Sequence, residues 1–424
     1  MKIAIIGSGI SGLSSALLLS QKHDITLIES DNRFGGHANT VNVIEQENTI
    51  PVDTGFIVYN ELNYPNLVGF FKWLEVETIS SDMSFAVSAR DGDLEYSGSL
   101  IGLFAQKKNY FNLNFYKMLK DIFVFFVFGY KYAFQVNENE TLKEYIKRCK
   151  FSSEFVNDHL IPMSSAIWSC PEKEILNFPA KSLLTFFKNH QLINFIIRPK
   201  WRTVKNGSKQ YVDKIIAKLK LNKKNRILLN VNIKSISNKN KKINIKFDNK
   251  IETFDKVIMA THPDQTINLI KNLENKSKDV LSKFKYQKNT VYLHSDTSLM
   301  PQNRKTWSSW NYLSTEQTIN KSSVTYWMNI LQNLNTSLNI FVSLNPYKKP
   351  KKDLIHKILY YEHPVFNLET NKAQNELDSI QGKNNIYYTG AWTAYGFHED
   401  GIKSAVKITK FLDVKIPWDN NYIE

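Results

Sequence analysis

The chain opens with short apolar runs that alternate with glycine-rich and polar turns. An apolar run over residues 2–6 leads directly into the sequence Gly-Ser-Gly-Ile-Ser-Gly at 7–12, and a second apolar run over 24–28 ends on Glu29. Between them, Leu13 and residues 16–19 supply the apolar face of a helix. This order predicts a strand, a helix and a second strand, packed as a βαβ unit.

The glycine spacing in the first turn indicates a dinucleotide-binding loop. Gly7 allows the tight turn out of the strand, Gly9 lets the backbone approach a pyrophosphate, and Gly12 permits close packing of the helix on the sheet. The helix N-terminus offers N–H groups to the phosphates, and Glu29 lies where a carboxylate can accept the ribose hydroxyls. The alternative is a structural β-turn-α unit with chance glycines. The predicted contacts also include Ser8, Ile10, Ser11 and Ser30.

The remaining pattern alternates between helical and extended stretches. Residues 80–200 are aromatic-rich and read as mostly helical beyond Gly102, whereas 201–262, including 226–233, reads as strands separated by Asn/Lys turns such as 238–241. Alternating residues over 290–294 and 323–328 predict antiparallel strands. A last strand over 386–391 is predicted to precede a helix that starts around Gly401.

Composition restricts the class of protein. A chain of 424 residues with 42% hydrophobic and 13% aromatic residues can bury a large core and should hold about two domains. Cys149 and Cys170 are too few for a disulfide framework, and we expect no signal peptide before Lys2, so a reducing cytoplasm is the expected location. The histidines lack metal-ligand spacing and no nucleophile elbow occurs, so we predict no metal site.

The net charge of +15 leaves two interpretations open. The lysines occur together with many asparagines, as an AT-rich coding sequence would produce, but an electrostatic partner is the alternative; we predict no nucleic-acid function. The apolar run 122–128 is too short to span a bilayer, which needs about 20 apolar residues. Extended to 113–134, it predicts an aromatic helix suited to a membrane interface or a greasy entry channel, and the alternative is a buried helix.

A second glycine motif identifies the dinucleotide by resemblance. The sequence Arg33-Phe34-Gly35-Gly36 resembles the R-x-G-G extension of the flavoprotein family that contains monoamine oxidases, polyamine oxidases and phytoene desaturases. The resemblance implies FAD as the cofactor. It also implies an α/β fold of the amine oxidase/phytoene desaturase type, with a three-piece Rossmann-like FAD domain on a parallel sheet (1–78, 200–270 and 380–415) and an inserted α+β substrate domain (79–199 and 271–379). The FAD contacts that it implies are Arg33, Gly35, Gly36, His37, Asp53, Thr54, Gly55, Val231, Gly390, Asp400 and Gly401.

Further strings are similar to a narrower group. They look like the bacterial predicted NAD/FAD-binding proteins of the amine oxidase superfamily, which are also similar to the flavin domain of plant cyclopropane fatty acid synthases. This similarity implies a lipophilic or lipid substrate and a cyclopropane synthase-like methyltransferase as partner. The aromatic helix predicted over 113–134 is the basis for expecting peripheral contact with the inner membrane face. The strings are Val52–Phe56, Met163–Ser169, Trp201–Val204, Val324–Asn329 and Gly390–Gly401.

The turn before the last helix carries the candidate catalytic residues. By analogy with amine oxidases, Trp392 and Tyr395, with Phe397, are expected to form an aromatic wall at the flavin. His398 beside Glu399 is a candidate proton shuttle, and the alternative is that these residues cap and pack the helix.

The lysine that true amine oxidases place near the flavin is replaced by Tyr292. Three functions therefore remain open. They are oxidation of a lipophilic substrate such as a membrane acyl chain, oxidation of an amine or amino acid with release of peroxide, and a non-catalytic flavoprotein that serves a lipid-modifying partner.

Overall fold

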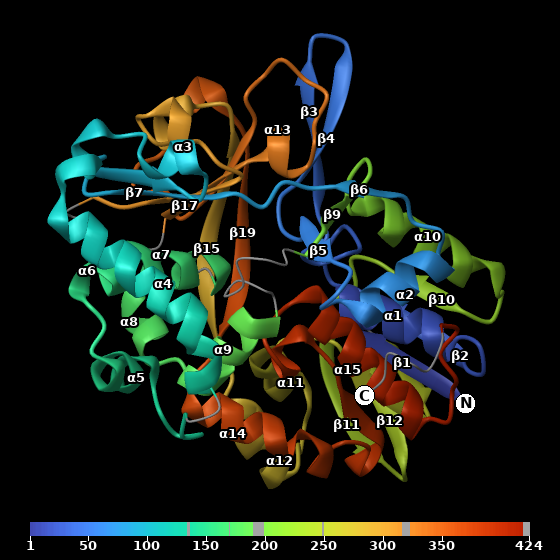
Figure 1. The fold of residues 1–424 in the computed structure, drawn as a ribbon. Coiled ribbons are helices and arrows are strands. Elements are labelled where there is room, and N and C mark those ends of the chain that lie inside the picture. Colours follow the sequence, from blue (N-terminus) through green and yellow to red (C-terminus); the bar gives the residue numbers. More distant parts are fainter. Residues whose placement is uncertain (134–135, 169, 190–198, 248–249, 316–322, 419–424) are drawn as a thin grey trace.

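The computed structural model describes residues 1–424 except 134–135, 169, 190–198, 248–249, 316–322 and 419–424 (Figure 1). A parallel sheet in the order β10-β2-β1-β14-β20 forms the nucleotide-binding half. Its strands are mostly apolar, because both faces of a parallel sheet are covered and most strand positions are then buried. These strands are β1 (Lys2–Ile6), β2 (Asp24–Ile28), β10 (Arg226–Leu228), β14 (Lys256–Met259) and β20 (Ile386–Tyr388).

Alternate residues of β1 enter two different cores. Ile3 and Ile5 pack against helices α1 (Ile10–Leu19), α10 (Lys209–Leu221) and α15 (His398–Phe411). Ala4 and Ile6 face the opposite side, toward a three-stranded sheet and two helices. These elements are β11 (Ile233–Lys239), β12 (Lys242–Phe247), β13 (Lys250–Phe254), α11 (Pro263–Leu269) and α12 (Asn275–Ser282).

A second, mixed sheet has the order β19-β15-β18-β17-β16-β7-β8. Its pairs are antiparallel except for the parallel pair of β16 with β7. The predicted fold, a parallel Rossmann-like sheet with a separate substrate-domain sheet, is confirmed, and so are the two predicted antiparallel strands. The strands are β7 (Phe85–Ala89), β8 (Leu94–Ser97), β15 (Lys285–His294), β16 (Trp310–Leu313), β17 (Ser323–Trp327), β18 (Phe341–Leu344) and β19 (Ile355–Val365).

Helices pack beside the mixed sheet, and one of them, α9, lies next to the nucleotide half (Figure 1). The long aromatic helix predicted over 113–134 is α4, and residue 134 lies outside the described residues. No helix among the described residues is both long and apolar enough to cross a membrane. The helices here are α3 (Leu100–Leu103), η1 (Lys107–Phe111), α4 (Leu113–Ala133), α5 (Leu142–Cys149), α6 (Ser153–Phe155), α7 (Ile161–Trp168), α8 (Glu172–Leu176) and α9 (Ala180–Asn189).

Smaller elements join the two halves. They are the hairpin β3 (Thr40–Glu45) and β4 (Asn48–Asp53), the sheet of β5 (Val58–Asn60), β9 (Trp201–Val204) and β6 (Thr78–Ser80), and the helices α2 (Pro65–Trp73), α13 (Met328–Leu331) and α14 (Leu368–Glu376). The domain boundaries proposed from the sequence stay predictions.

Two expectations for residues 201–262 are wrong. The stretch contains helix α10, whose residues Tyr211, Val212, Ile215 and Leu219 are buried at helical spacing. The run 226–233 is also not one strand, because Asn230 adopts a positive φ of 58° and separates β10 from β11. The predicted Asn/Lys turn at 238–241 does connect β11 to β12.

Candidate functional site

The first glycine loop lies at the carboxyl end of β1, where ligands bind in open α/β sheets. Gly7 has a φ of +97°, and a Cβ on it would lie 2.6 Å from the carbonyl oxygen of Ala260. A Cβ on Gly12 would lie 1.9 Å from the oxygen of Gly7. A Cβ on Gly9, in contrast, would meet no atom within 4 Å. Gly7 and Gly12 therefore allow close backbone packing that a larger residue would prevent, whereas Gly9 faces open space.

The N-terminus of α1 is buried but has no side-chain cap. All ten residues of the helix are buried, including Ile10, Ser11 and Gly12, and Gly9 at the N-cap position has no side chain that could accept a hydrogen bond from the N–H groups of the first turn. Buried N–H groups need a partner, and the positive end of a helix favours an anion. This uncapped end therefore fits a diphosphate.

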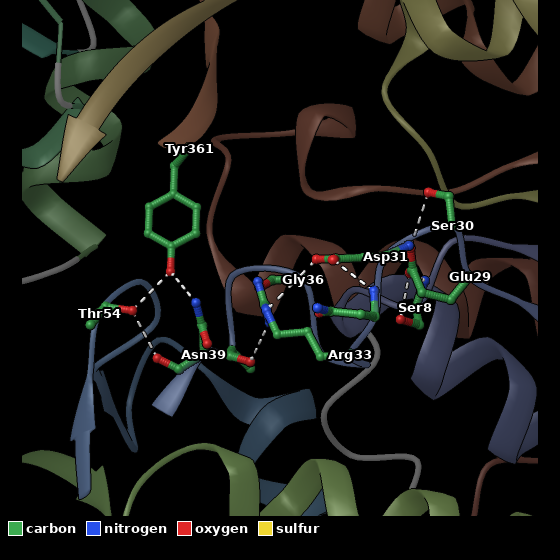
Figure 2. Close-up of polar contacts among 11 residues, drawn as sticks. Ser8, Glu29, Ser30, Asp31, Arg33, Gly36, Asn39, Thr54 and Tyr361 are labelled. Carbon is green, nitrogen blue, oxygen red and sulfur yellow. Dashed lines mark hydrogen bonds and ion pairs between the residues drawn. The ribbon is translucent and has the colours of Figure 1, made fainter. Parts of the chain in front are cut away.

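The second glycine loop packs directly on the first. The N–H of Gly35 donates to the oxygen of Ser8 at 3.0 Å, and a Cβ on Gly36 would lie 3.0 Å from the Cα of Gly9. Arg33 donates to the carbonyl oxygen of Gly36 at 2.8 Å (Figure 2). The arginine thus holds its own loop in place beside the open space at Gly9.

Glu29 and its neighbours border the same loop (Figure 2). One Glu29 oxygen accepts hydrogen bonds from the N–H and the hydroxyl of Ser8 at 2.8 and 2.6 Å. The other accepts from the N–H of Asp31 at 2.9 Å and from the Ser30 hydroxyl at 3.3 Å. The N–H of Val231 donates to the Glu29 carbonyl at 3.0 Å, so the carbonyl of Val231 is the backbone group left for an adenine.

The N-terminus of α15 meets the N-terminus of α1. A Cβ on Gly401 would lie 2.7 Å from Cγ2 of Ile10 and 2.8 Å from the hydroxyl of Ser11. Gly390, in the turn before this helix, donates its N–H to Ser404 at 3.0 Å. The predicted residues at the two ends of the chain therefore come together at one place.

The polar cluster at the start of α15 has mostly structural contacts. Glu399 accepts from the N–H groups of Asn66 and Leu67 at 3.0 and 2.9 Å and so caps α2. Asp400 accepts from the N–H groups of Phe397 and Tyr395 at 2.9 and 3.2 Å and caps its own helix. Asp400 therefore makes the contacts of the capping alternative, whereas Glu399 caps a different helix than that alternative expected, and the catalytic role of Glu399 stays a prediction.

His398 does not have the basicity expected from its sequence neighbours. Its ring stacks on Phe56 at a centroid distance of 3.7 Å, and its Nε2 lies 3.1 Å from the hydroxyl of Tyr211. Burial lowers the pKa of His398 to about 3. Glu399, the other half of the candidate proton shuttle, does not raise the pKa of His398, because its carboxylate is directed to α2.

The expected aromatic wall is divided. Tyr395 and Phe397 contact Phe186 of α9 at centroid distances of 6.0 and 4.9 Å. Trp392 packs against Phe284 at 4.6 Å, within the core on the other face of the parallel sheet. Tyr395 and Phe397 therefore face the helices of the substrate half, and Trp392 does not stand with them.

Residues 53–55 are held in place by buried hydrogen bonds and close backbone packing beside the glycine loops. Asp53 is fully buried and accepts from the N–H of Ser208 at 2.9 Å and from the hydroxyls of Ser208 and Thr40 at 2.7 and 2.6 Å. Burial raises the pKa of Asp53 to about 6. The hydroxyl of Thr54 bonds Tyr361 at 2.8 Å (Figure 2), and a Cβ on Gly55 would lie 2.2 Å from the oxygen of His37.

A cluster of three histidines beside this segment was missed in the sequence. The His37 ring lies 5.2 Å from that of His363 and 4.9 Å from that of Tyr361. His262 stacks on Tyr286 at 3.8 Å. The cluster joins the two halves of the protein, because His37 and His262 follow the glycine loop and β14, whereas His363 lies on β19 of the mixed sheet.

Burial keeps the three imidazoles neutral. It lowers the pKa of His363 to about 4, and the pKa of His37 falls well below its usual range because of burial and the neighbouring histidines. The pKa of His262 is lowered by burial and raised in part by Glu362, 3.4 Å away. In the sequence, His37 adjoins Gly36 and His262 follows a buried strand, but no spacing connects either residue to His363.

Two observations concern possible sites elsewhere in the protein. Within the described ranges, no group of His, Cys, Asp and Glu side chains could hold a metal ion. A cavity of about 650 Å³ lies in the substrate half, lined by residues such as Asp91, Met300 and Trp307, and it shares no residue with the glycine loops.

Comparisons with known proteins agree with this arrangement. The family model described as "Flavin containing amine oxidoreductase" matches residues 10–292. No curated protein sequence matches the chain. Solved structures share the fold at low identity. A CLA-producing fatty acid isomerase from P. acnes is 15% identical with a TM-score of 0.68, and 97% of this chain and 98% of that one are covered. Putrescine oxidase bound to putrescine is 12% identical with a TM-score of 0.67, over 97% and 99% of the chains. Cyclohexylamine oxidase from Brevibacterium oxydans is 14% identical with a TM-score of 0.65, over 97% and 99%.

Proposed function

The chain belongs to the family of flavin-containing amine oxidoreductases and is an FAD-dependent oxidoreductase, and from its site we propose that it oxidises a lipophilic substrate, such as the acyl chain of a membrane lipid. The observation that carries this proposal is the chemistry of the groups around the N-terminus of α15. Aromatic rings face the substrate half there, and the buried carboxylates are engaged by backbone N–H groups.

The residues present fit FAD. The uncapped N-terminus of α1 and the open space at Gly9 would hold the diphosphate, with Gly36 beside it. Glu29 borders the position of the ribose and would accept its hydroxyls in exchange for some of its present hydrogen bonds from Ser8, Ser30 and Asp31. The N-terminus of α15 at Gly401 would lie at the flavin end. Bound FAD supplies the acceptor for a hydride equivalent, which the protein must position and shield from water.

An apolar substrate suits these surroundings better than a cation. An ammonium group in a buried site needs a free carboxylate or a similar partner to offset its desolvation. Asp53, Glu399 and Asp400 each accept two or more hydrogen bonds from the protein itself, which leaves them poorly placed to serve as that partner.

The histidine cluster would orient the substrate without adding charge. Neutral imidazoles can accept or donate a hydrogen bond, and His363 already lies 2.7 Å from the side-chain amide of Asn289. Such groups can hold one polar atom of an otherwise apolar molecule beside the reacting carbon. With a pKa of about 4, His363 would be a weak base at neutral pH.

Anaerobic reduction of the bound flavin tests the substrate class. The purified protein is mixed with fatty acids and phospholipids carrying saturated, unsaturated or cyclopropane acyl chains, and with a panel of polyamines and amino acids, while the flavin absorbance is followed. The proposal expects bleaching by an acyl compound only. Bleaching by amines, with peroxide formed in air well above the buffer control, would overturn it in favour of amine oxidation.

We also propose a cyclopropane synthase-like methyltransferase as partner, on the basis of the resemblance to the plant fusion proteins. Co-purification of the two proteins expressed together, compared with an unrelated methyltransferase, tests this. Equal recovery of both methyltransferases would contradict it.

A further inference from the structure

One flank of the substrate half carries many exposed apolar side chains. More than half of the large apolar residues that are exposed in the described part of the chain fall within residues 100–128, on α3, η1 and α4. Isolated exposed apolar residues are ordinary, but a contiguous group usually marks an interaction site. The group, here called the 100–128 surface, consists of Leu100, Ile101, Tyr110, Phe111, Leu113, Tyr116, Phe123, Val127 and Phe128.

These residues form one surface rather than a scatter. Tyr116 donates its hydroxyl to the carbonyl of Tyr110 at 3.1 Å, and the Tyr110 ring stacks on Phe104 at 4.7 Å. Residues 113, 116, 120, 123 and 127 of α4 share one helix face, because they follow each other at intervals of three or four. The three elements succeed each other along the flank that lies away from the parallel sheet (Figure 1).

The helix α4 is apolar on both its inner and outer faces. Phe115, Met118 and Phe125 point inward and are at most 2% exposed. Large apolar side chains on the outer face of a helix, here beside Lys120, are expected in a protein core or in lipid and not at a surface that faces only water. Phe125 therefore belongs to the core and not to the outer surface.

The charged residues on this surface are mostly lysines, which favours an anionic partner. Residues 100–128 contain four lysines, at 107, 108, 117 and 120, and Asp121 as the acidic residue. Asp121 accepts the N–H of Ser152 at 2.7 Å. Within the described part of the chain, Lys107 and Lys120 take part in no ion pair, whereas Lys108 pairs with Asp93. A twofold dimer through this surface would bring lysines against lysines, since such an interface is self-complementary.

We propose that the 100–128 surface docks on an anionic lipid bilayer. Aromatic and aliphatic side chains would enter the interfacial region while the lysines remain at the level of the anionic headgroups. The inference does not depend on the chemistry proposed above, although it would place the substrate half at a source of acyl chains.

Vesicle co-sedimentation of the full, flavin-loaded protein tests this docking. The probes are vesicles of phosphatidylcholine with phosphatidylglycerol, and vesicles of phosphatidylcholine alone. The triple variant Ile101→Ser, Phe111→Ser and Leu113→Ser removes side chains that are 74%, 91% and 78% exposed. We expect it to weaken binding to the anionic vesicles by roughly tenfold or more, because each lost side chain removes apolar burial. Its flavin content should be unchanged.

A matched control removes equally exposed apolar residues elsewhere. Leu221→Ser, Ile251→Ser and Tyr360→Ser act on side chains that are 82%, 66% and 78% exposed. This control should bind like the wild type, and Lys107→Gln with Lys120→Gln should reduce binding to anionic vesicles only. Wild-type protein that stays in the supernatant, or equal losses in both triple variants, would overturn the proposal. So would a dimer in sedimentation velocity that the first triple variant dissociates.

Discussion

Replacing Gly9 by valine separates binding of the cofactor from folding more cleanly than any other change in the loop. A Cβ at this position meets no protein atom within 4 Å, and Gly9 has φ −64° and ψ −178°, which any residue can adopt. The cost to folding should therefore stay within about 1 kcal/mol, the size of a change at an uncapped N-cap position. The open space around Gly9 is where the diphosphate would lie.

The expected loss of FAD affinity follows from the backbone contacts. A valine side chain would keep the diphosphate away from the first turn of α1, which would remove at least two hydrogen bonds to a charged group. At about 1.5 kcal/mol or more for each such bond, the loss is about 3 kcal/mol, or on the order of 100-fold in Kd. FAD content after gel filtration and fluorescence titration of the apoprotein measure both effects.

Two further glycines provide controls for this experiment. Gly98→Val is also in open space, with no atom within 4 Å of its Cβ, and it should retain flavin. Gly12→Val should fail to fold, because its Cβ would lie 1.9 Å from the oxygen of Gly7. Normal flavin content in Gly9→Val would refute the reasoning, as would an equal loss of flavin in Gly98→Val.

Three other measurements each test one side chain. Glu29→Ala should weaken FAD binding by about 1–3 kcal/mol if the carboxylate accepts the ribose hydroxyls; unchanged affinity in a calorimetric titration would place the ribose elsewhere. Burial raises the pKa of Asp53 from 3.8 to about 6, so the native state holds this proton more tightly than the unfolded chain. The resulting stability is complete below pH 3.8 and is lost as the pH rises to about 6. The free energy of unfolding of the wild type, compared with Asp53→Asn, should therefore fall by up to about 3 kcal/mol over that range; a constant difference in urea melts would contradict this. With a pKa lowered to about 3 by burial, His398 should stay neutral from about pH 5 upward, and an NMR titration near its ordinary value would disprove the packing described.

The N-terminal βαβ unit could be predicted because its signals are local. The apolar run of β1, the glycine spacing and the apolar face of α1 all lie within the first 28 residues, and each has a direct physical role. Helix α10 was also readable in principle, since Tyr211, Val212, Ile215 and Leu219 follow a helical period. The many lysines and asparagines in the same stretch are typical of turns and obscure this helical period.

The histidine cluster could not be derived from spacing. His37, His262 and His363 come from three distant segments, and only the packing of β19 against the carboxyl edge of the parallel sheet brings them together. For the same reason the sequence neighbours His398 and Glu399 looked like a catalytic pair. They lie on different sides of α15, and each has its own partner, Tyr211 and Asn66.

An experimental structure of the flavin-loaded protein tests the central claim most directly, namely that FAD extends from the two glycine loops to the N-terminus of α15 and faces the histidine cluster. The account predicts the diphosphate against Gly9 and Gly36, and the flavin ring between Gly401 and the side chains of His37 and His363. A ring that lies away from these residues, for example in the cavity lined by Met300 and Trp307, would contradict it.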